Sequence, residues 1–244
     1  MLKREDIFRD LENMGAQRSG VVLMHTAYRT VGEVEGGASG FLDALIEYFT
    51  YDGGLFCLPA HTWMNFGKPI TLDMTSPESN LGILPVIAAK DKRGIRTENP
   101  THSIIVFGDR DRALDFAKDE RWIDNPTAKN SCYGKLYDLD GSILLVGVDQ
   151  TKNTYIHAVE EMLGAKNRLT DEYYSFGVKR VSGEIYDHKM RWLDERAYGD
   201  VSHRFSKFAL PFRYHKVTEY GFLGNAPTEL CSARGIYRVL EKNI

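Results

Sequence analysis

Four short apolar runs, separated by polar and glycine-rich stretches, most constrain what this chain can fold into. They span residues 20–25, 53–59, 102–108 and 141–148. Each has the length of a buried strand, and stretches with helical apolar spacing follow, such as "FLDALIEYF" and "RDRALDFAKD". Strands that alternate with helices predict an α/β fold with a central, mostly parallel or mixed sheet flanked by helices.

Both ends of the chain add further predicted elements. Residues 3–14 have the apolar spacing of a short amphipathic helix. From Tyr173 the sequence "YYSFGVKRVSGEIYDHKMRWLDE" alternates around Ser182-Gly183, which predicts a β-hairpin insertion in the C-terminal third. The last forty residues predict a glycine-centred turn at "YGFLGNAP" and a helix over "TELCSARGIYRVLEK". No repeat or linker-like stretch divides the chain, so residues 1–244 are predicted to form a single domain.

Charge and composition exclude several functional classes. The formal net charge is −3, so no basic excess is available to neutralise nucleic-acid phosphates. No stretch approaches the roughly 20 apolar residues that span a membrane, and no signal-peptide core follows the N-terminus. The three cysteines are widely separated, which suits a reducing compartment and predicts a cytoplasmic location. The oligomeric state is left open, a homo-oligomer included.

Polar side chains stand at the ends of several apolar runs. His25 closes the first run, His61 follows the second, and the fourth run leads into the turn before His157. In open α/β sheets the ligand crevice lies outside the carboxyl ends of the strands. These positions are therefore expected at one crevice. His102 differs, because it enters its run rather than leaving it.

His157 and Glu160 form the most informative pair in the sequence "NTYIHAVE". Their spacing places both on one face of a helix, close enough to touch. One interpretation is an ordinary surface pair, and the other is a general base with the carboxylate that orients it. A metal site is not predicted, because HExxH is absent and the other histidines lack zinc-ligand spacing. A covalent intermediate is not predicted either, since there is no Gly-x-Ser-x-Gly elbow.

The loop "HTAYRTVGEVEGGASG" is the second informative stretch. Gly36 and Gly37 stand where a helix begins, and free amides at such an end favour anionic groups. Arg29 adds a fixed positive charge with forked donors. The loop is neither a Walker loop nor a GxGxxG motif, so from its residues alone phosphate binding stays one of several alternatives.

Taken together, these stretches resemble the aminoglycoside 3-N-acetyltransferase family, acetyl-coenzyme A enzymes that differ in fold from the GNAT acetyltransferases. The resemblance covers nearly the whole chain and is carried by "VVLMHTAYRTVGEVEGGASGFLDALIEYFTYDGGLFCLPAHTW", "LGILPVIAAKDKRGIRTENPTHSIIVFG" and "NSCYGKLYDLDGSILLVGVDQTKNTYIHAVEE". It implies that His157 and Glu160 match the family's His-x-x-Glu pair at the acceptor amine. It also implies that the loop and the helix start hold the coenzyme, through His25, Thr26, Arg29, Gly32, Gly36 and Gly37.

The resemblance implies an acetyl-coenzyme A dependent N-acetyltransferase that acts by direct transfer, with His157 as general base. The expected partners are coenzyme A and an amine-bearing small molecule, an aminoglycoside or a related amino sugar. One departure is Asn99-Pro100, where the family commonly has His-Pro, so a contact made by that histidine is missing or shifted to His102. Acidic residues between about 165 and 200 are available for a cationic acceptor. The alternatives are a same-fold acyltransferase with another acceptor, a silent coenzyme-binding protein and a metal-dependent hydrolase.

Overall fold

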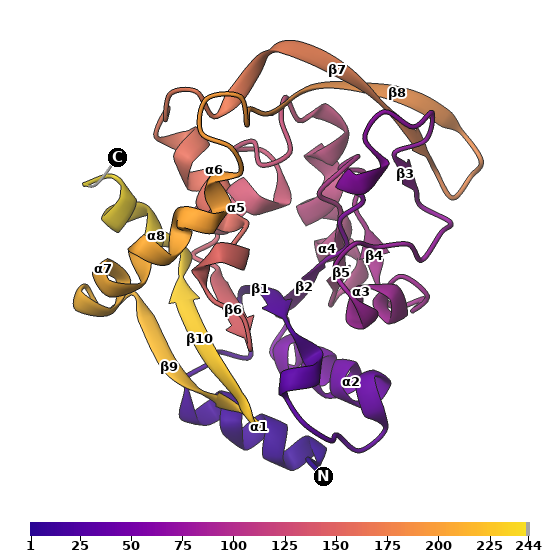
Figure 1. Cartoon of the computed structure of the whole chain (residues 1–244). Coiled ribbons are helices and arrows are strands. Elements are labelled where there is room, and N and C mark those ends of the chain that lie inside the picture. Colours follow the sequence, from indigo (N-terminus) through magenta and orange to yellow (C-terminus); the bar gives the residue numbers. More distant parts are fainter. Residues whose placement is uncertain (243–244) are drawn as a thin grey trace.

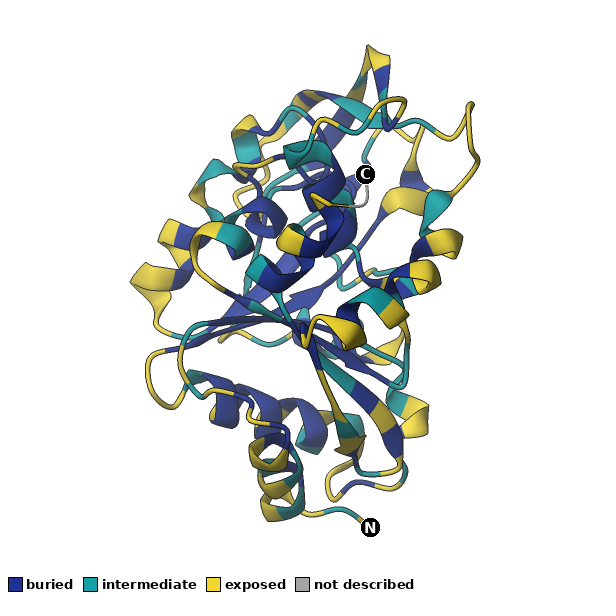
Figure 2. Cartoon of the chain, turned by 90° about the vertical axis from the view of Figure 1, so that its left-hand side faces the viewer, coloured by how far each residue is buried: buried dark blue, intermediate teal, exposed yellow. Residues whose placement is uncertain are grey.

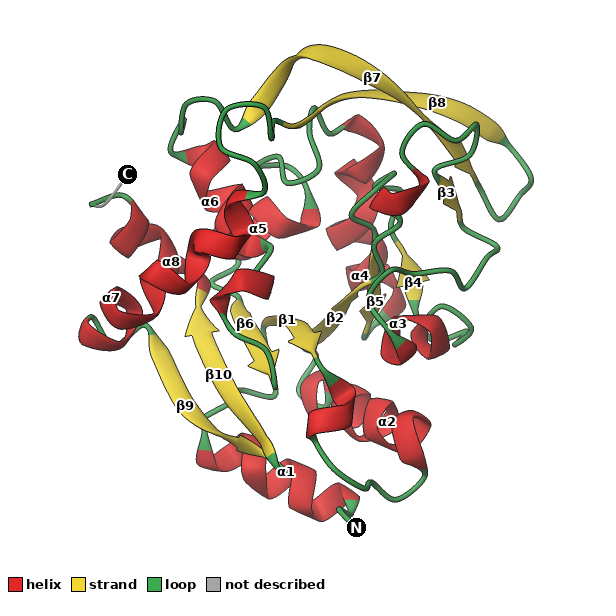
Figure 3. Cartoon of the chain, in the orientation of Figure 1, coloured by secondary structure: helices red, strands yellow, loops and turns green. Residues whose placement is uncertain are grey.

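The computed structural model describes residues 1–242, which form strands and helices in alternation along most of the chain (Figure 3). The strands are β1 (Val21–Thr26), β2 (Leu55–Pro59), β3 (Leu72–Asp73), β4 (Ile95–Arg96), β5 (Ile104–Phe107), β6 (Ser142–Val146), β7 (Leu169–Lys179), β8 (Ile185–Leu193), β9 (Thr218–Leu223) and β10 (Ala226–Ser232). The α-helices are α1 (Arg4–Asn13), α2 (Gly37–Thr50), α3 (Ile83–Ala88), α4 (Arg110–Ala117), α5 (Cys132–Asp138), α6 (Tyr155–Met162), α7 (Ala209–Tyr214) and α8 (Ala233–Leu240).

A seven-stranded mixed sheet lies at the centre, in the order β4-β5-β2-β1-β6-β10-β9. Strand β1 runs parallel to β2 and to β6, whereas β5 is antiparallel to β2 and β10 is antiparallel to β6. Helices cover both faces of this sheet (Figures 1 and 2). The predicted α/β fold with a mixed sheet flanked by helices is confirmed.

Successive side chains of the central strands pack alternately into two apolar cores, one on each face of the sheet. In β1, Val22 and Met24 face the core with α1, α2 and α3, while Val21 and Leu23 face the core with α4, α5, α6 and α8. In the first core the ring of Phe56 stacks between those of Phe49 and Phe107. Burying one such ring stabilises the fold by about 1.5–3 kcal/mol.

The direction of β5 changes the place of His102. Because β5 is antiparallel to β2, its start lies at the same sheet edge as the carboxyl ends of β1, β2 and β6. His102 precedes β5 and therefore reaches the same crevice as His25 and His61. The contrast drawn from the sequence between His102 and these two histidines does not hold in space.

The predicted β-hairpin is confirmed as β7 and β8, which pair in antiparallel register with Tyr173 opposite Arg191. The turn between them contains Gly183 at a φ of 88°, a left-handed conformation that glycine adopts without strain. The hairpin arches over the carboxyl edge of the main sheet (Figure 1). It buries Phe176 and Met190 against Ile123. The hairpin therefore forms a roof over the crevice.

The predicted C-terminal helix begins later than its sequence indicates. Residues 228–232 belong to β10, which pairs with both β6 and β9, and α8 starts at Ala233. The hydroxyl of Ser232 accepts a hydrogen bond from the Gly235 backbone N–H at 3.0 Å and caps the helix. Pairing on both sides outweighs the helical spacing of this segment. The turn at Gly224 is confirmed, and it joins two strands that the sequence analysis did not predict.

Within residues 1–242, no helix has both the length and the apolar character that a membrane span requires.

Candidate active site

Four histidines from four separate segments line one cavity of about 270 Å³ at the carboxyl edge of the sheet. His25 is the penultimate residue of β1, His61 follows β2, His102 precedes β5 and His157 lies in the first turn of α6. The rings of His61 and His102 are 4.4 Å apart, and His61 Nε2 lies 2.7 Å from the Tyr133 hydroxyl. The topology therefore brings together histidines that are up to 132 residues apart in the sequence.

His157 and Glu160 lie side by side, as the spacing predicted. Nδ1 of His157 is 3.4 Å from Oε2 of Glu160, and the two side chains are 10% and 12% exposed. Arg168, which the sequence analysis did not single out, completes the group. Its Nε donates to Glu160 Oε2 at 2.9 Å, and its Nη2 lies 3.2 Å from His157 Nδ1. The other ring nitrogen, Nε2, has no hydrogen-bond partner among residues 1–242, and the ring lines the cavity.

Glu160 is held in its ionised form. Burial by itself would raise the pKa of this carboxyl, but the contacts with His157 and Arg168 outweigh burial and lower it below its ordinary value. A carboxylate beside Nδ1 can orient an imidazole and stabilise its protonated form. The pair thus has the electrostatics that a general base and its supporting carboxylate need.

The other three cavity histidines are neutral. Burial lowers the pKa of His25 to about 4, and burial together with the nearby charge of His157 lowers that of His102 to about 3. Burial and the neighbouring histidines hold the pKa of His61 well below its ordinary value. Neutral imidazoles can donate or accept a hydrogen bond without adding charge. They leave His157 as the cavity histidine best placed to exchange a proton.

These buried histidines predict a pH-dependent stability. Between pH 6.5 and about 4 the unfolded chain binds protons that folded His25 and His102 do not, so the free energy of unfolding falls as the pH falls. We expect the His102→Asn variant to lose at least about 1.4 kcal/mol of this dependence, the equivalent of one pKa unit. Urea unfolding of both proteins across this range measures it. Parallel stability curves for the two proteins would contradict the expectation.

The residues predicted to hold the coenzyme fall into three groups. Thr26 and Arg29 line a second pocket of about 300 Å³, opposite residues 81–84, and Leu81 borders both this pocket and the histidine cavity. His25 lines the histidine cavity itself. Gly32, Gly36 and Gly37 line neither space. Gly32 packs against Asn225, and Gly36 and Gly37 start α2 with positive φ at an exposed position.

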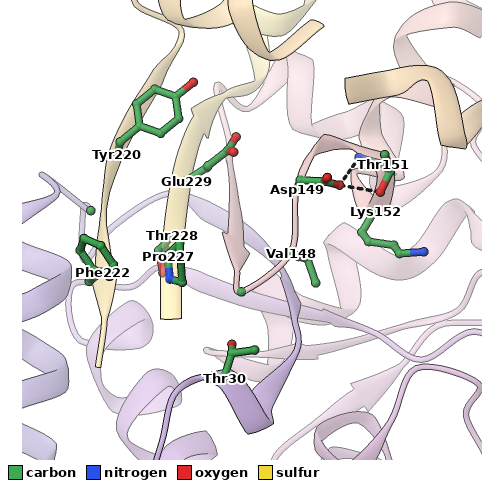
Figure 4. A pocket seen from close by; sticks show the side chains of 12 residues that line it. Thr30, Val148, Asp149, Thr151, Lys152, Tyr220, Phe222, Pro227, Thr228 and Glu229 are labelled. Carbon is green, nitrogen blue, oxygen red and sulfur yellow. Dashed lines mark hydrogen bonds between the residues drawn. The ribbon is translucent and has the colours of Figure 1, made fainter. Parts of the chain in front are cut away.

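A wider groove of about 770 Å³ shares lining residues with the histidine cavity. It lies between the β6–α6 connection and strands β9 and β10, with Tyr220 and Phe222 along one wall (Figure 4). Thr151 and Lys152 line both the groove and the cavity. Lys152 is exposed and makes no ion pair among residues 1–242. The groove and the Thr26–Arg29 pocket thus each share lining residues with the His157 cavity.

The acidic residues available for a cationic acceptor differ in where they lie and in whether they already pair with an arginine. Glu172 and Asp194 pair with Arg196, and Glu184 pairs with Arg180, so these carboxylates are engaged on the hairpin surface. Glu195 instead lines the His157 cavity. Asp200, at the end of the same region, also lines it.

Aromatic side chains complete the mouth of the cavity. Trp63 follows β2 two residues after His61, and Trp192 comes from the β7–β8 hairpin. The Trp192 ring lies 5.9 Å from that of His102. Within residues 1–242, no three His, Cys, Asp or Glu side chains are arranged to share a metal ion.

Comparison with known proteins gives one consistent result. The model of the family described as aminoglycoside 3-N-acetyltransferase matches residues 23–244. The aminoglycoside N(3)-acetyltransferase IV of Salmonella sp is 26% identical over 238 residues, which cover 96% of this chain and 84% of that protein. An aminoglycoside acetyltransferase AAC(3)-IVa mutant in complex with a gentamicin superposes with a TM-score of 0.81 at 21% identity, covering 99% of this chain and 87% of that one.

A second solved structure is AAC-IIIb in a binary complex with CoASH. It superposes with a TM-score of 0.79 at 19% identity and covers 100% of this chain and 97% of that chain. At these identities the two structures show a shared fold, including the mixed sheet and its flanking helices.

Proposed function

The chain belongs to the aminoglycoside 3-N-acetyltransferase family, and from this premise we propose that it transfers an acetyl group from acetyl-coenzyme A directly to an amino group of an aminoglycoside or related amino sugar. One observation carries the proposal most strongly. His157, with Glu160 beside its Nδ1, lines a cavity that adjoins the Thr26–Arg29 pocket and has Glu195 among its lining residues. A base thus lies between a candidate donor site and a candidate acceptor site.

The donor side suits the coenzyme chemically. The Thr26 hydroxyl is buried and has no hydrogen-bond partner among residues 1–242, so it is free to donate to a ligand oxygen. Arg29 is exposed and makes no ion pair among the same residues, which leaves its guanidinium free for a phosphate. Gly36 and Gly37 stay predicted contacts at the start of α2, where the Gly37 N–H already donates to the Val34 carbonyl at 2.9 Å. Acetyl-coenzyme A supplies the activated acetyl group as a thioester.

The chemistry at His157 follows from what an amine needs before it can attack. An amine is mostly protonated at neutral pH, so a base must remove a proton before or during attack on the thioester carbonyl. His157 Nε2 takes that proton, the amine nitrogen bonds to the carbonyl carbon, and the carbon–sulfur bond then breaks. The imidazolium returns its proton to the leaving sulfur, and the second proton lost by the ammonium nitrogen passes to solvent. Glu160 stabilises the imidazolium, and Thr26 or backbone amides support the oxyanion.

The acceptor side suits a cation. Glu195 is an exposed carboxylate that makes no side-chain ion pair among residues 1–242, and Trp63 and Trp192 line the same cavity. A polar amine with additional ammonium groups can place one of them at Glu195 while another faces His157. Aromatic faces add attraction for such cations. This arrangement supports an acceptor with more than one amino group.

We expect Glu195→Gln to raise KM for a polyamine acceptor by about 2- to 5-fold and to leave kcat unchanged, because an exposed ion pair is worth about 0.2–1 kcal/mol. Steady-state kinetics at low and high salt measure this, and the effect shrinks with salt. Glu184→Gln is the matched control, since Glu184 pairs with Arg180 near the hairpin turn. Equal KM values for the two variants at low salt would remove Glu195 from acceptor binding.

The proposed activity is tested by incubating the protein with acetyl-coenzyme A and a panel of aminoglycosides and simple amino sugars. Thiol release and mass spectrometry follow the two products, which should appear in equal amounts. Acetylation of amines outside the aminoglycosides alone would favour a same-fold enzyme with another acceptor. A silent coenzyme-binding protein would be stabilised by coenzyme A in thermal unfolding and yet release no thiol on addition of any amine.

A further inference from the structure

Arg168 lies in the connection between α6 and β7 and folds back onto α6. Its backbone carbonyl accepts a hydrogen bond from the Asp194 N–H at 2.9 Å, so the start and the end of the hairpin fix its position. The residue is 9% exposed. Its side chain contacts Glu160 through Nε and the His157 ring through Nη2. A buried cation thus touches both members of the proposed base and carboxylate pair.

Arg168 and Glu160 require opposite protonation states of one atom, His157 Nδ1. A guanidinium only donates hydrogen bonds, so its contact with His157 Nδ1 requires a lone pair on that nitrogen. A neutral ring then carries its proton on Nε2. Glu160 only accepts, so a hydrogen bond to it requires the proton on Nδ1. The Arg168 contact is 3.2 Å and the Glu160 contact is 3.4 Å, so the cavity without ligand favours the Arg168 arrangement.

We propose that Arg168 is a positioning residue that selects the tautomer of His157. In the free protein it donates to Nδ1 and keeps the ring proton on Nε2, the nitrogen that must be bare to act as a base. An amine that donates to Nε2 favours the other tautomer, in which Nδ1–H bonds Glu160 and Arg168 retains only its bond to Glu160. The ligand shifts the equilibrium by its differential affinity for the two tautomers. This role in catalysis rests on the proposed function, but the tautomer of the free protein does not.

The tautomer is read by nitrogen NMR of protein with ¹⁵N-labelled histidine, at a pH where the His157 ring is neutral. A His157→Gln sample assigns the signals. We expect the His157 proton on Nε2 in the free wild-type protein. We expect it on Nδ1 in the Arg168→Met variant, and also on Nδ1 in the wild type with coenzyme A and an amine acceptor bound. Relative to the free wild type, the low-field resonance of the unprotonated ring nitrogen should therefore move from Nδ1 to Nε2 in both of the other samples. Arg191→Met is the matched control, because Arg191 is on β8 and pairs with Asp124 rather than with Glu160.

A His157 ring proton found on Nδ1 in the free wild-type protein would by itself overturn the proposal. So would an unchanged Nε2–H tautomer in folded Arg168→Met, or a shift of the same size in Arg191→Met. These spectra require no catalytic turnover, so they test the tautomer assignment independently of acetyl transfer. Absence of acetyl transfer by the wild type would instead reject the proposed function.

Discussion

Replacing His157 by alanine lowers the rate of acetyl transfer by about 10²- to 10⁴-fold, the usual range for loss of a general base. The ring is the cavity group placed to take a proton from the amine, because its Nε2 is unpartnered among residues 1–242 and Glu160 supports its charged form. The other cavity histidines are neutral and buried, so they do not replace it. Single-turnover measurement of thiol release gives the rate of the chemical step.

The variant should keep its fold and its coenzyme affinity. His157 packs against Phe205, with ring centroids 4.8 Å apart, so removal of the ring costs some packing, which thermal unfolding reports. His215→Ala is the control, since His215 is exposed beyond α7, and it should retain full activity. A His157→Ala protein that binds coenzyme A and turns over at the wild-type rate would exclude this residue from the mechanism.

The second large effect is on stability. Glu160→Gln lowers the free energy of unfolding by about 3–5 kcal/mol, because it leaves the guanidinium of Arg168 buried without a carboxylate. The rate of acetyl transfer falls as well, since the amide gives the imidazolium no opposite charge. Urea unfolding at neutral pH measures the stability. Glu184→Gln is again the control, because its ion pair is more exposed and is worth at most about 1 kcal/mol.

The cost of Glu160→Gln depends on pH with a defined sign. The pKa of Glu160 is lowered in the folded state, so this carboxylate contributes stability that is fully present above its unfolded pKa of about 4.5. The contribution is lost as the pH falls through the lower folded pKa. The difference in unfolding free energy between wild type and variant should therefore shrink below pH 4.5. A difference that grows with acidity, or that is absent at pH 7, would contradict the ion-pair assignment.

The sequence predicted the order of the main elements well, because apolar runs such as residues 141–148 are bounded by glycine and fill buried strands. It did not predict strand direction at β5, which depends on how the chain returns across the sheet. The helix predicted from Thr228 is wrong over residues 228–232, because these residues gain their stability as part of β10 from pairing with β6 and β9. The capping serine at 232 is a local signal that could have placed the helix start correctly.

Some contacts of the candidate site follow from local spacing in the sequence, and others depend on the long-range topology of the fold. His157 and Glu160 lie on one helical turn, so their contact follows from local spacing alone. Arg168 and Glu195 reach the site through the path of the hairpin, which no local pattern specifies. His102 reaches it because β5 is antiparallel to β2. Spacing thus identifies groups on one element, while groups that meet through long-range topology require the structure.

A crystal structure with coenzyme A and an aminoglycoside bound tests the central claim most directly. We expect the sulfur in the His157 cavity, reached past Thr26 and Arg29, and an amino nitrogen of the acceptor about 2.6–3.2 Å from His157 Nε2. A sulfur seated away from this cavity, or an imidazole turned from both ligands, would contradict the account.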